Sequence, residues 1–285
     1  MKPFVQKNLS TPIMSRYTMI TSRKNKKIVD ITKLLQRKHR QRQQRFVVQG
    51  LDIIMTALNK NLAPINALYC YEEFKNDTSE VILQRLHSAG ADLIEVSDHV
   101  MQSLSWRDEP EGIIVTFHLY DTSLGTLSDR LSNQKGLIFI LDHLQDPGNV
   151  GTLIRTADGI GAEAIILIEP SVDPFDPKTL AASAGSLFNI PLARTGNVEE
   201  LFQNISSEVS IIGTDAQKGT IIWESENLSG PTALVLGNEA QGISTETVKY
   251  INDWIRLPMP GNTESLNVGV AGGTLAYFWL MAQHK

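Results

Sequence analysis

Three segments in the second half of the 285-residue chain place polar side chains in glycine-bearing loops, where they could act on a bound ligand. In one of them, Leu257–Ala271, two prolines and a glycine lead into Ser265 and Asn267 and then into an apolar helix. Few side chains cover the backbone of such a loop, so its amides and carbonyls are free to bind a ligand. Ser and Asn are also favoured at helix N-termini, and capping is the simpler interpretation of this segment alone.

The other two segments shift that balance toward a functional site. One carries Asn149 and Arg155, and the other carries Gly237 and Glu239. Each runs from an apolar strand into a loop with glycine and then into a helix. This order puts the four residues at the carboxyl ends of strands, where open α/β sheets bind their ligands. Packing alone does not explain three such loops in one half of a chain.

Together the three segments resemble the signature motifs of the SpoU family of RNA ribose 2′-O-methyltransferases, within the SPOUT class. The motifs occur in this order: Asn149-x-Gly151-x3-Arg155, Gly237-x-Glu239-x2-Gly242 and Pro258-Met259-x-Gly261-x3-Ser265-Leu266-Asn267-Val268. Three concurrent motifs are a specific signal, whereas any one of them is weak. The resemblance covers about residues 136–285. It departs from the family at Gly269, where a second Ser is frequent, so a polar contact of the last motif is missing.

The resemblance implies an α/β fold in which a small α/β substrate-binding domain precedes a parallel-sheet methyltransferase domain with a trefoil knot around residues 233–285. It implies S-adenosylmethionine as the methyl donor and a homodimer whose interface completes the site. The donor would be held largely by backbone groups near small or apolar residues: Gly213, Leu236, Gly237, Leu257, Met259 and Leu266. The apolar helix over residues 267–283 could pack on a partner subunit, although core packing explains part of its composition.

The implied reaction is attack of a ribose 2′-hydroxyl on the sulfonium methyl group. Arg155 is the first candidate for a catalytic role, because a forked guanidinium suits the phosphate of the target nucleotide. Arginine keeps its proton, so orientation and charge stabilisation are its expected contributions. Asn149 would hydrogen-bond the ribose or Glu239, and Glu239 would organise the loop. The remaining candidates, beside the sugar and the donor, are Ser265 and Asn267.

Charge is strongly segregated along the chain and indicates a polyanionic partner. The first 45 residues hold 13 Lys or Arg and a single acid, whereas the other 240 residues hold 13 basic and 30 acidic ones. A basic arm on an acidic body suits RNA, and a solvated tail is the alternative on charge alone. The candidate contacts to the RNA backbone are Arg23, Lys24, Lys26, Lys27, Arg37, Lys38, Arg40, Arg42 and Arg45.

Periodicity predicts four regions: a basic arm and helix over residues 1–45, the small α/β domain over 46–120, a polar linker over 121–135, and the methyltransferase domain over 136–285. Five strands are expected in the last region because apolar runs there are continuous, as in a parallel sheet covered on both faces. Their expected ranges are 137–142, 164–168, 210–214, 233–236 and 254–257. Helices are expected near 150–160, 178–187, 198–206 and 244–252, besides 267–283.

Composition limits the remaining possibilities. The single cysteine, Cys70, excludes a disulfide framework within the chain, and it lies in an apolar run as a core residue would. No signal peptide is evident, the longest late apolar run is too short to span a bilayer, and a reducing cytoplasm is expected. No His, Cys or carboxylate cluster has metal-ligand spacing, and the chemistry requires no metal.

Three alternatives follow from the same residues. Large-subunit ribosomal RNA is the favoured substrate, with resistance to a ribosome-targeting antibiotic as a further outcome, and transfer RNA is second. A non-catalytic RNA-binding or ribosome-assembly protein that kept the knot is a different class of function. A nucleotide-dependent dehydrogenase is weaker still, because Gly148-x2-Gly151 is not the dinucleotide fingerprint.

Overall fold

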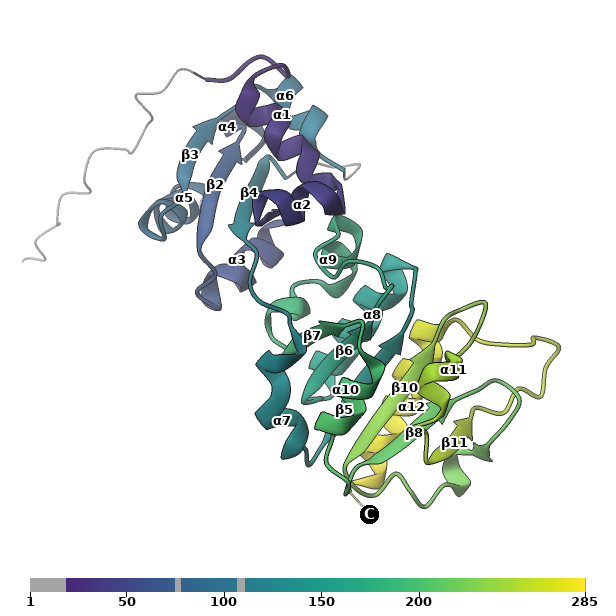
Figure 1. Ribbon diagram of the computed structural model, residues 1–285. Helices are drawn as coiled ribbons and strands as arrows, with labels where there is room; N and C mark the ends of the chain where they lie inside the picture. The colour runs from purple at the N-terminus through teal and green to yellow at the C-terminus, as the bar shows by residue number, and fades with distance from the viewer. Residues whose placement is uncertain (1–18, 75–77, 107–110, 285) are drawn as a thin grey trace, which may run out of the picture.

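The computed structural model describes residues 19–74, 78–106 and 111–284, which form two α/β units joined near residue 120 (Figure 1). Of the region expected as a basic arm, residues 1–18 lie outside this description. No helix in the described ranges is long and apolar enough to cross a membrane.

The first unit is built on a four-stranded sheet in the order β1-β4-β2-β3, with β2 and β3 parallel and the other pairs antiparallel. Side chains alternate along the strands, so Phe46 and Val48 face one side and Val47 faces the other. One face packs on helices α3 and α5, and the opposite face packs on α1 and α6. Its elements are α1 (Lys26–Thr32), η1 (Lys33–Leu35), α2 (Arg37–Gln43), β1 (Arg45–Gln49), α3 (Leu51–Asn59), β2 (Pro64–Tyr69), α4 (Tyr71–Phe74), α5 (Ser79–Ser88), β3 (Asp92–Glu95), α6 (Asp98–Leu104) and β4 (Ile113–His118).

The described part of the basic segment, residues 19–44, packs on this unit. Ile28, Ile31 and Leu34 are buried against the sheet in one apolar cluster. The helix expected within the basic region is interrupted, because Gln36 adopts an extended conformation between η1 and α2. Cys70, at the end of β2, is buried as expected from its apolar surroundings.

The second unit is a seven-stranded sheet in the order β7-β6-β5-β10-β8-β11-β9, and every pair within it is parallel. Both faces are covered: α8, α9 and α12 pack on one, and α7 and α10 pack on the other. Its elements are η2 (Leu124–Leu127), α7 (Ser128–Ser132), β5 (Leu137–Asp142), α8 (Pro147–Gly159), β6 (Ala164–Ile168), α9 (Pro177–Ser183), η3 (Ser186–Phe188), β7 (Leu192–Thr195), α10 (Val198–Asn204), β8 (Ser210–Thr214), β9 (Thr220–Ile221), η4 (Ile222–Glu224), β10 (Thr232–Gly237), α11 (Thr245–Val248), β11 (Asp253–Arg256) and α12 (Val268–Ala282).

The segment expected as a polar linker, residues 121–135, is instead folded onto this sheet. It forms η2 and α7, and Leu124, Leu127 and Leu131 are buried in the apolar cluster beneath α10. These leucines recur at helical spacing among Ser, Thr, Asp and Gly, so the polar composition hid a short amphipathic element.

The parallel sheet and its covering helices agree with the fold that the motifs implied. The strand order brings β10 between β5 and β8, so the loops that follow β5, β10 and β11 lie at the same end of the sheet (Figure 1). Strand order does not establish how the chain is threaded, and the knot stays a prediction.

Candidate active site

Asn149 joins the three sequence motifs through its side-chain amide. Its Nδ2 donates a hydrogen bond of 3.0 Å to Oε1 of Glu239, and its Oδ1 accepts one of 2.8 Å from Nδ2 of Asn267. Glu239 and Asn267 lie 90 and 118 positions from Asn149 along the chain. The segments that the sequence singled out therefore converge on a single amide.

The position of Asn149 is fixed by the start of α8. Asp146 is the N-cap of this helix, and its side chain accepts a 2.7 Å hydrogen bond from the backbone N–H of Asn149. Pro147 follows at the first helical position, where its missing N–H costs nothing. Cap and proline together hold the first turn of α8, so the Asn149 amide points at the other two loops.

Asn267 caps α12 and also binds Asn149. Its Oδ1 accepts from the backbone N–H groups of Gly269 and Val270, at 2.9 and 3.3 Å. The capping interpretation of this residue was correct, and the same side chain takes part in the site through its other end. A Cβ on Gly269 would lie 3.1 Å from this Oδ1. The glycine that replaces the usual serine of the motif thus sits in a tight place beside the cap.

A cavity of about 650 Å³ opens beside these three residues. Its wall combines the ends of β8, β10 and β11 with the loop that leads into α12. Five of the six residues expected to hold the donor line it, as do three of the five catalytic candidates: Leu236, Gly237, Leu257, Met259 and Leu266, and Glu239, Ser265 and Asn267.

The properties of this cavity suit S-adenosylmethionine. Leucine and methionine side chains offer an apolar slot for adenine, and loop backbone offers hydrogen-bonding edges. Gly237 has no room for a side chain, because a Cβ there would lie 2.3 Å from the backbone of Gly242 and Ile243. The close approach of these two loop segments shapes the cavity wall.

Acidic side chains predominate around the cavity. Asp215, Glu239 and Glu264 line it, and Arg256 is the only Lys or Arg among the lining residues. Burial alone would raise the pKa of Asp215, but hydrogen bonds from the backbone N–H groups of Gln217 and Lys218 outweigh it and lower that pKa. An acidic wall favours a ligand with positive charge, such as a sulfonium.

Three expected residues are not part of the cavity lining: Asn149, which contacts the lining residues Glu239 and Asn267, and Gly213 and Arg155. Gly213 is buried in β8, where a Cβ would lie 2.7 Å from Ile251 and 2.9 Å from Trp254, so it provides packing space, and the next residue, Thr214, lines the cavity. Arg155 is exposed on α8, two helical turns beyond Asn149, and its side chain makes no hydrogen bond or ion pair with another described residue.

Sequence reasoning missed the supports behind the loops. Asp142 is fully buried at the end of β5 and accepts a 2.7 Å hydrogen bond from the backbone N–H of Ser244. Asn238 donates to the backbone oxygen of His143 at 2.8 Å, which ties the loop after β10 to the end of β5. Asp146 gave a usable signal, because Asp before Pro at the start of a helix is a common N-terminal pattern.

The basic candidates fall into distinct environments on the first unit. Lys24, Lys26, Lys38 and Arg42 are exposed, and their side chains have no hydrogen bond or ion pair with other described residues. The others are engaged: Lys27 with Asp92, Arg23 with the backbone of His99, Arg45 with Gln43, and Arg37 with Glu169.

Arg40 is removed from the RNA-binding set. Its side chain is 1% exposed and pairs with Asp173. The regular run of Arg and Lys in the sequence could not distinguish this buried residue from its exposed neighbours.

Known proteins match this chain in both of its units. The family model described as SpoU rRNA Methylase family matches residues 136–277, and the one described as MRM3-like substrate binding domain matches residues 25–115. The second match includes α1 and α2, in keeping with their packing on the first sheet.

Relatives match over nearly the whole chain. An rRNA methyltransferase of Sinorhizobium meliloti is 30% identical with a TM-score of 0.81, covering 92% of this chain and 96% of that one. An AdoMet-bound rRNA methyltransferase of the same organism is 29% identical with a TM-score of 0.82, covering 92% of this chain and 97% of that one. The 23S rRNA (guanosine(2553)-2′-O)-methyltransferase RlmP of Bacillus subtilis is 29% identical over 90% of this chain and 97% of the relative. The chain thus belongs to the SpoU family, and it is an S-adenosylmethionine-dependent RNA methyltransferase.

Proposed function

We propose that this enzyme methylates the 2′-oxygen of a ribose in large-subunit ribosomal RNA and acts in the cytoplasm, where ribosomes assemble. The observation that carries the proposal is the pair of hydrogen bonds from Asn149 to Glu239 and Asn267, which bring three loops together beside the cavity. The rRNA specificity is supported by the first unit, which resembles a substrate-binding domain, and by relatives named for 23S rRNA.

The residues divide the work as follows. S-adenosylmethionine, when bound, supplies an electrophilic methyl group on a sulfonium. Asn149, Glu239 and Asn267 hold the loops so that the cavity keeps its shape, and Ser265 offers a hydroxyl at its rim. Arg155, exposed on α8 outside the cavity lining, would bind the phosphate of the target nucleotide and orient the 2′-hydroxyl. As the oxygen–carbon bond forms, the bond between the methyl group and sulfur would break to leave a thioether, and the hydroxyl proton would pass to phosphate or water.

The exposed cations of the first unit bind the RNA backbone away from the reacting ribose. Such contacts increase affinity and salt sensitivity without reading sequence. Lys24, Lys26, Lys38 and Arg42 have no side-chain partner in the described ranges, so RNA affinity should fall as the salt concentration increases. Target choice then rests on the folded shape or the unpaired bases of the RNA.

A second copy of the chain is the expected partner of α12. Val270, Tyr277 and Met281 are 55%, 53% and 60% exposed and recur on one face of this helix. Three large, exposed apolar side chains along one face of a helix are unusual on a surface that has no partner. Sedimentation should show a dimer, and Tyr277→Asp should convert it to monomers; a monomeric wild-type protein would contradict this part of the proposal.

Methyl transfer to defined RNA decides the substrate. Purified enzyme with tritiated S-adenosylmethionine should label unmodified large-subunit rRNA, with the label in ribose, and should leave transfer RNA unlabelled. Label in transfer RNA alone would replace the rRNA proposal. If neither rRNA nor transfer RNA were labelled although the enzyme binds the donor, the proposed function would be rejected.

The cellular role follows from where the methyl group lies. Mapping ribose methylation across cellular RNA, with and without the gene, identifies the nucleotide. If it lies in a drug-binding region of the ribosome, deletion should lower the minimal inhibitory concentration of that drug. Unchanged sensitivity to ribosome-targeting drugs would make the modification a housekeeping one.

A further inference from the structure

The two units of the protein meet across a buried cluster of charged side chains. At its centre is Arg40 of α2, whose Nη2 and Nε lie 2.7 and 2.9 Å from Oδ2 of Asp173. Arg40 Nη2 also lies 3.5 Å from Asp176, and Nη1 donates to the backbone oxygen of Leu34 at 2.9 Å. Asp173 is 6% exposed, so this pair is shielded from solvent.

Two further arginines extend the cluster from both sides. Arg194 of β7 pairs with Glu169 and lies 3.8 Å from Asp173. Arg37 of α2 reaches across from the first unit to Glu169, at 3.0 Å. Three arginines from two units therefore meet three carboxylates, all of which lie in the loop between β6 and α9. We call this set the junction cluster: Arg37, Arg40, Arg194, Glu169, Asp173 and Asp176.

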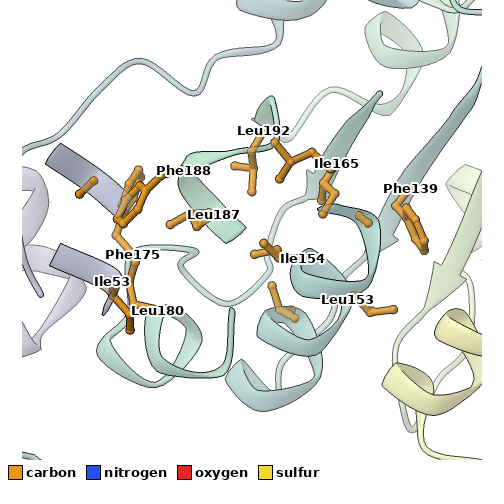
Figure 2. Close-up of a cluster of buried hydrophobic side chains, with 14 of the residues drawn as sticks. Ile53, Phe139, Leu153, Ile154, Ile165, Phe175, Leu180, Leu187, Phe188 and Leu192 are labelled. Carbon is orange, nitrogen blue, oxygen red and sulfur yellow. The ribbon is translucent and has the colours of Figure 1, made fainter. Parts of the chain in front are cut away.

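Apolar packing surrounds the junction cluster. The ring of Phe46 in β1 lies 4.8 Å from that of Phe175 and 6.1 Å from that of Phe188. Ile53 of α3 belongs to the same cluster of buried side chains, and Figure 2 shows it beside Leu180 at one end of the group. Apolar contacts hold surfaces together without specifying direction, whereas ion pairs with several hydrogen bonds tolerate few orientations.

The junction cluster is connected to the active site through two helices. The loop between β6 and α9, which carries its three carboxylates, leads into α9. Helix α9 packs closely along α8, since a Cβ on Gly151 would lie 2.4 Å from Ala182. The first turn of α8 carries Asn149. The orientation of the first unit is therefore set relative to the same helix that positions the three motif loops.

From this arrangement we infer that Arg40 is a positioning residue, which through Asp173 fixes the angle at which the first unit presents RNA to the donor cavity. The effect of Arg40 on RNA methylation rests on the proposed function, whereas its effect on the angle between the two units depends only on the geometry. A fixed angle lets contacts on both units act on one RNA at once, which raises the effective concentration of the target ribose at the cavity.

Distance measurement between spin labels tests the geometry without any RNA. The lone Cys70 is replaced by Ala, and Glu80→Cys on α5 and Glu246→Cys on α11 provide exposed labelling sites on the two units. The otherwise unsubstituted protein should give one narrow distance distribution. Arg40→Met should broaden or shift it, whereas Arg130→Met, at an exposed site on α7, should leave it unchanged.

Kinetics on unmodified large-subunit rRNA, transcribed in vitro, test the consequence. Arg40→Met should raise the KM for RNA roughly tenfold, since two sets of contacts lose their alignment, and should change kcat less than twofold. Donor affinity by calorimetry should stay unchanged. Arg40→Lys keeps the charge but not the fork of donors, so its KM for RNA should lie between the KM of the wild type and that of Arg40→Met. Arg130→Met should match the wild-type KM.

Each outcome has a defined meaning. An unchanged distance distribution in Arg40→Met overturns the inference, as does a broadened one with an unchanged KM. If Arg40→Met does not fold, Arg37→Met breaks a partly exposed ion pair between the two units and should broaden the same distance distribution. A narrow distribution in Arg37→Met would then contradict the proposed role of the junction cluster. Broadening in a protein that methylates no RNA would keep the geometric half and reject the proposed function.

Discussion

Replacing Asn149 by Asp tests whether the junction of the three motifs supports catalysis. The substitution keeps the size of the side chain and its ability to accept the hydrogen bond from Asn267. It removes the donor that faces Glu239 and places a second carboxylate 3.0 Å from the first. The loop after β10 should therefore be pushed away from α8.

The magnitude follows from two terms. Losing a hydrogen bond to a charged acceptor costs about 1.5 kcal/mol. Two unit charges 3.0 Å apart in a water-like dielectric repel by about 1.4 kcal/mol, and this dielectric is appropriate because Glu239 is exposed. Together they give about 3 kcal/mol, so we expect kcat/KM for RNA to fall roughly 150-fold.

A double-mutant cycle makes the reasoning refutable. In Asn149→Asp with Glu239→Gln, the new amide can donate to the new carboxylate, which restores the hydrogen bond in the opposite direction. Methyl transfer under single-turnover conditions should recover to within about tenfold of wild type, since the repulsion of about 1.4 kcal/mol is gone. Glu239→Gln alone should cost roughly three- to fivefold. A double variant no better than Asn149→Asp would mean that one of these side chains acts on the substrate directly and that the loop argument is wrong.

Three other perturbations follow from the structure. Gly237→Ala would place a Cβ 2.3 Å from loop backbone, so donor affinity by calorimetry should fall at least tenfold for an overpacking cost of about 1–3 kcal/mol; Gly196→Ala, with open space around it and outside the motif loops, is the control and should bind the donor normally. Glu264→Gln removes one acid from the cavity wall. The ratio of the dissociation constants of the thioether product and the sulfonium donor should then fall about threefold, as expected for an exposed charge. An unchanged ratio would exclude this contribution of Glu264. Desolvation and a hydrogen bond with Asp98 raise the pKa of Glu73 from 4.5 to about 7. The folded protein then holds this proton above the pH at which the unfolded chain has lost it, so the free energy of unfolding should decline between pH 4.5 and 7, and Glu73→Gln should flatten that decline in urea titrations.

Buried parallel strands were the most predictable part of the fold. The predicted ranges for β5, β6 and β8 agree with the structure at both ends. In β5 and β6 the reason is a continuous apolar run with an abrupt polar boundary, whereas β8 has only an apolar pair between polar ends. Two strands were missed. β7 (Leu192–Thr195) contains Arg194, which interrupts the apolar run, and β9 (Thr220–Ile221) has only two residues at the sheet edge. Short edge strands carry too little pattern to be recognised.

The site was predictable to the extent that it consists of loop residues at strand ends. Motif order identified the residues that meet, but not which of them bond, since that depends on side-chain direction. Arg40 shows the limit most clearly. Its sequence environment is cationic, yet its partner Asp173 lies 133 residues away in the other unit. Local composition favours solvent or RNA for such a residue, and only tertiary packing supplies the buried acid.

Capping and function were opposed as interpretations of Asn267, and the structure shows why they are compatible. An Asn side chain has an acceptor at one end and two donors at the other. At position 267 the acceptor satisfies backbone N–H groups at the start of α12, and the donor reaches Asn149. Ionised Asp has no donor, and Ser would have to accept from the backbone and donate to Asn149 through one oxygen, whereas Asn carries out the two functions at separate atoms. A residue type common at helix N-termini is thus required here for a further reason, and the same fixed helix start holds the third loop in register with the first.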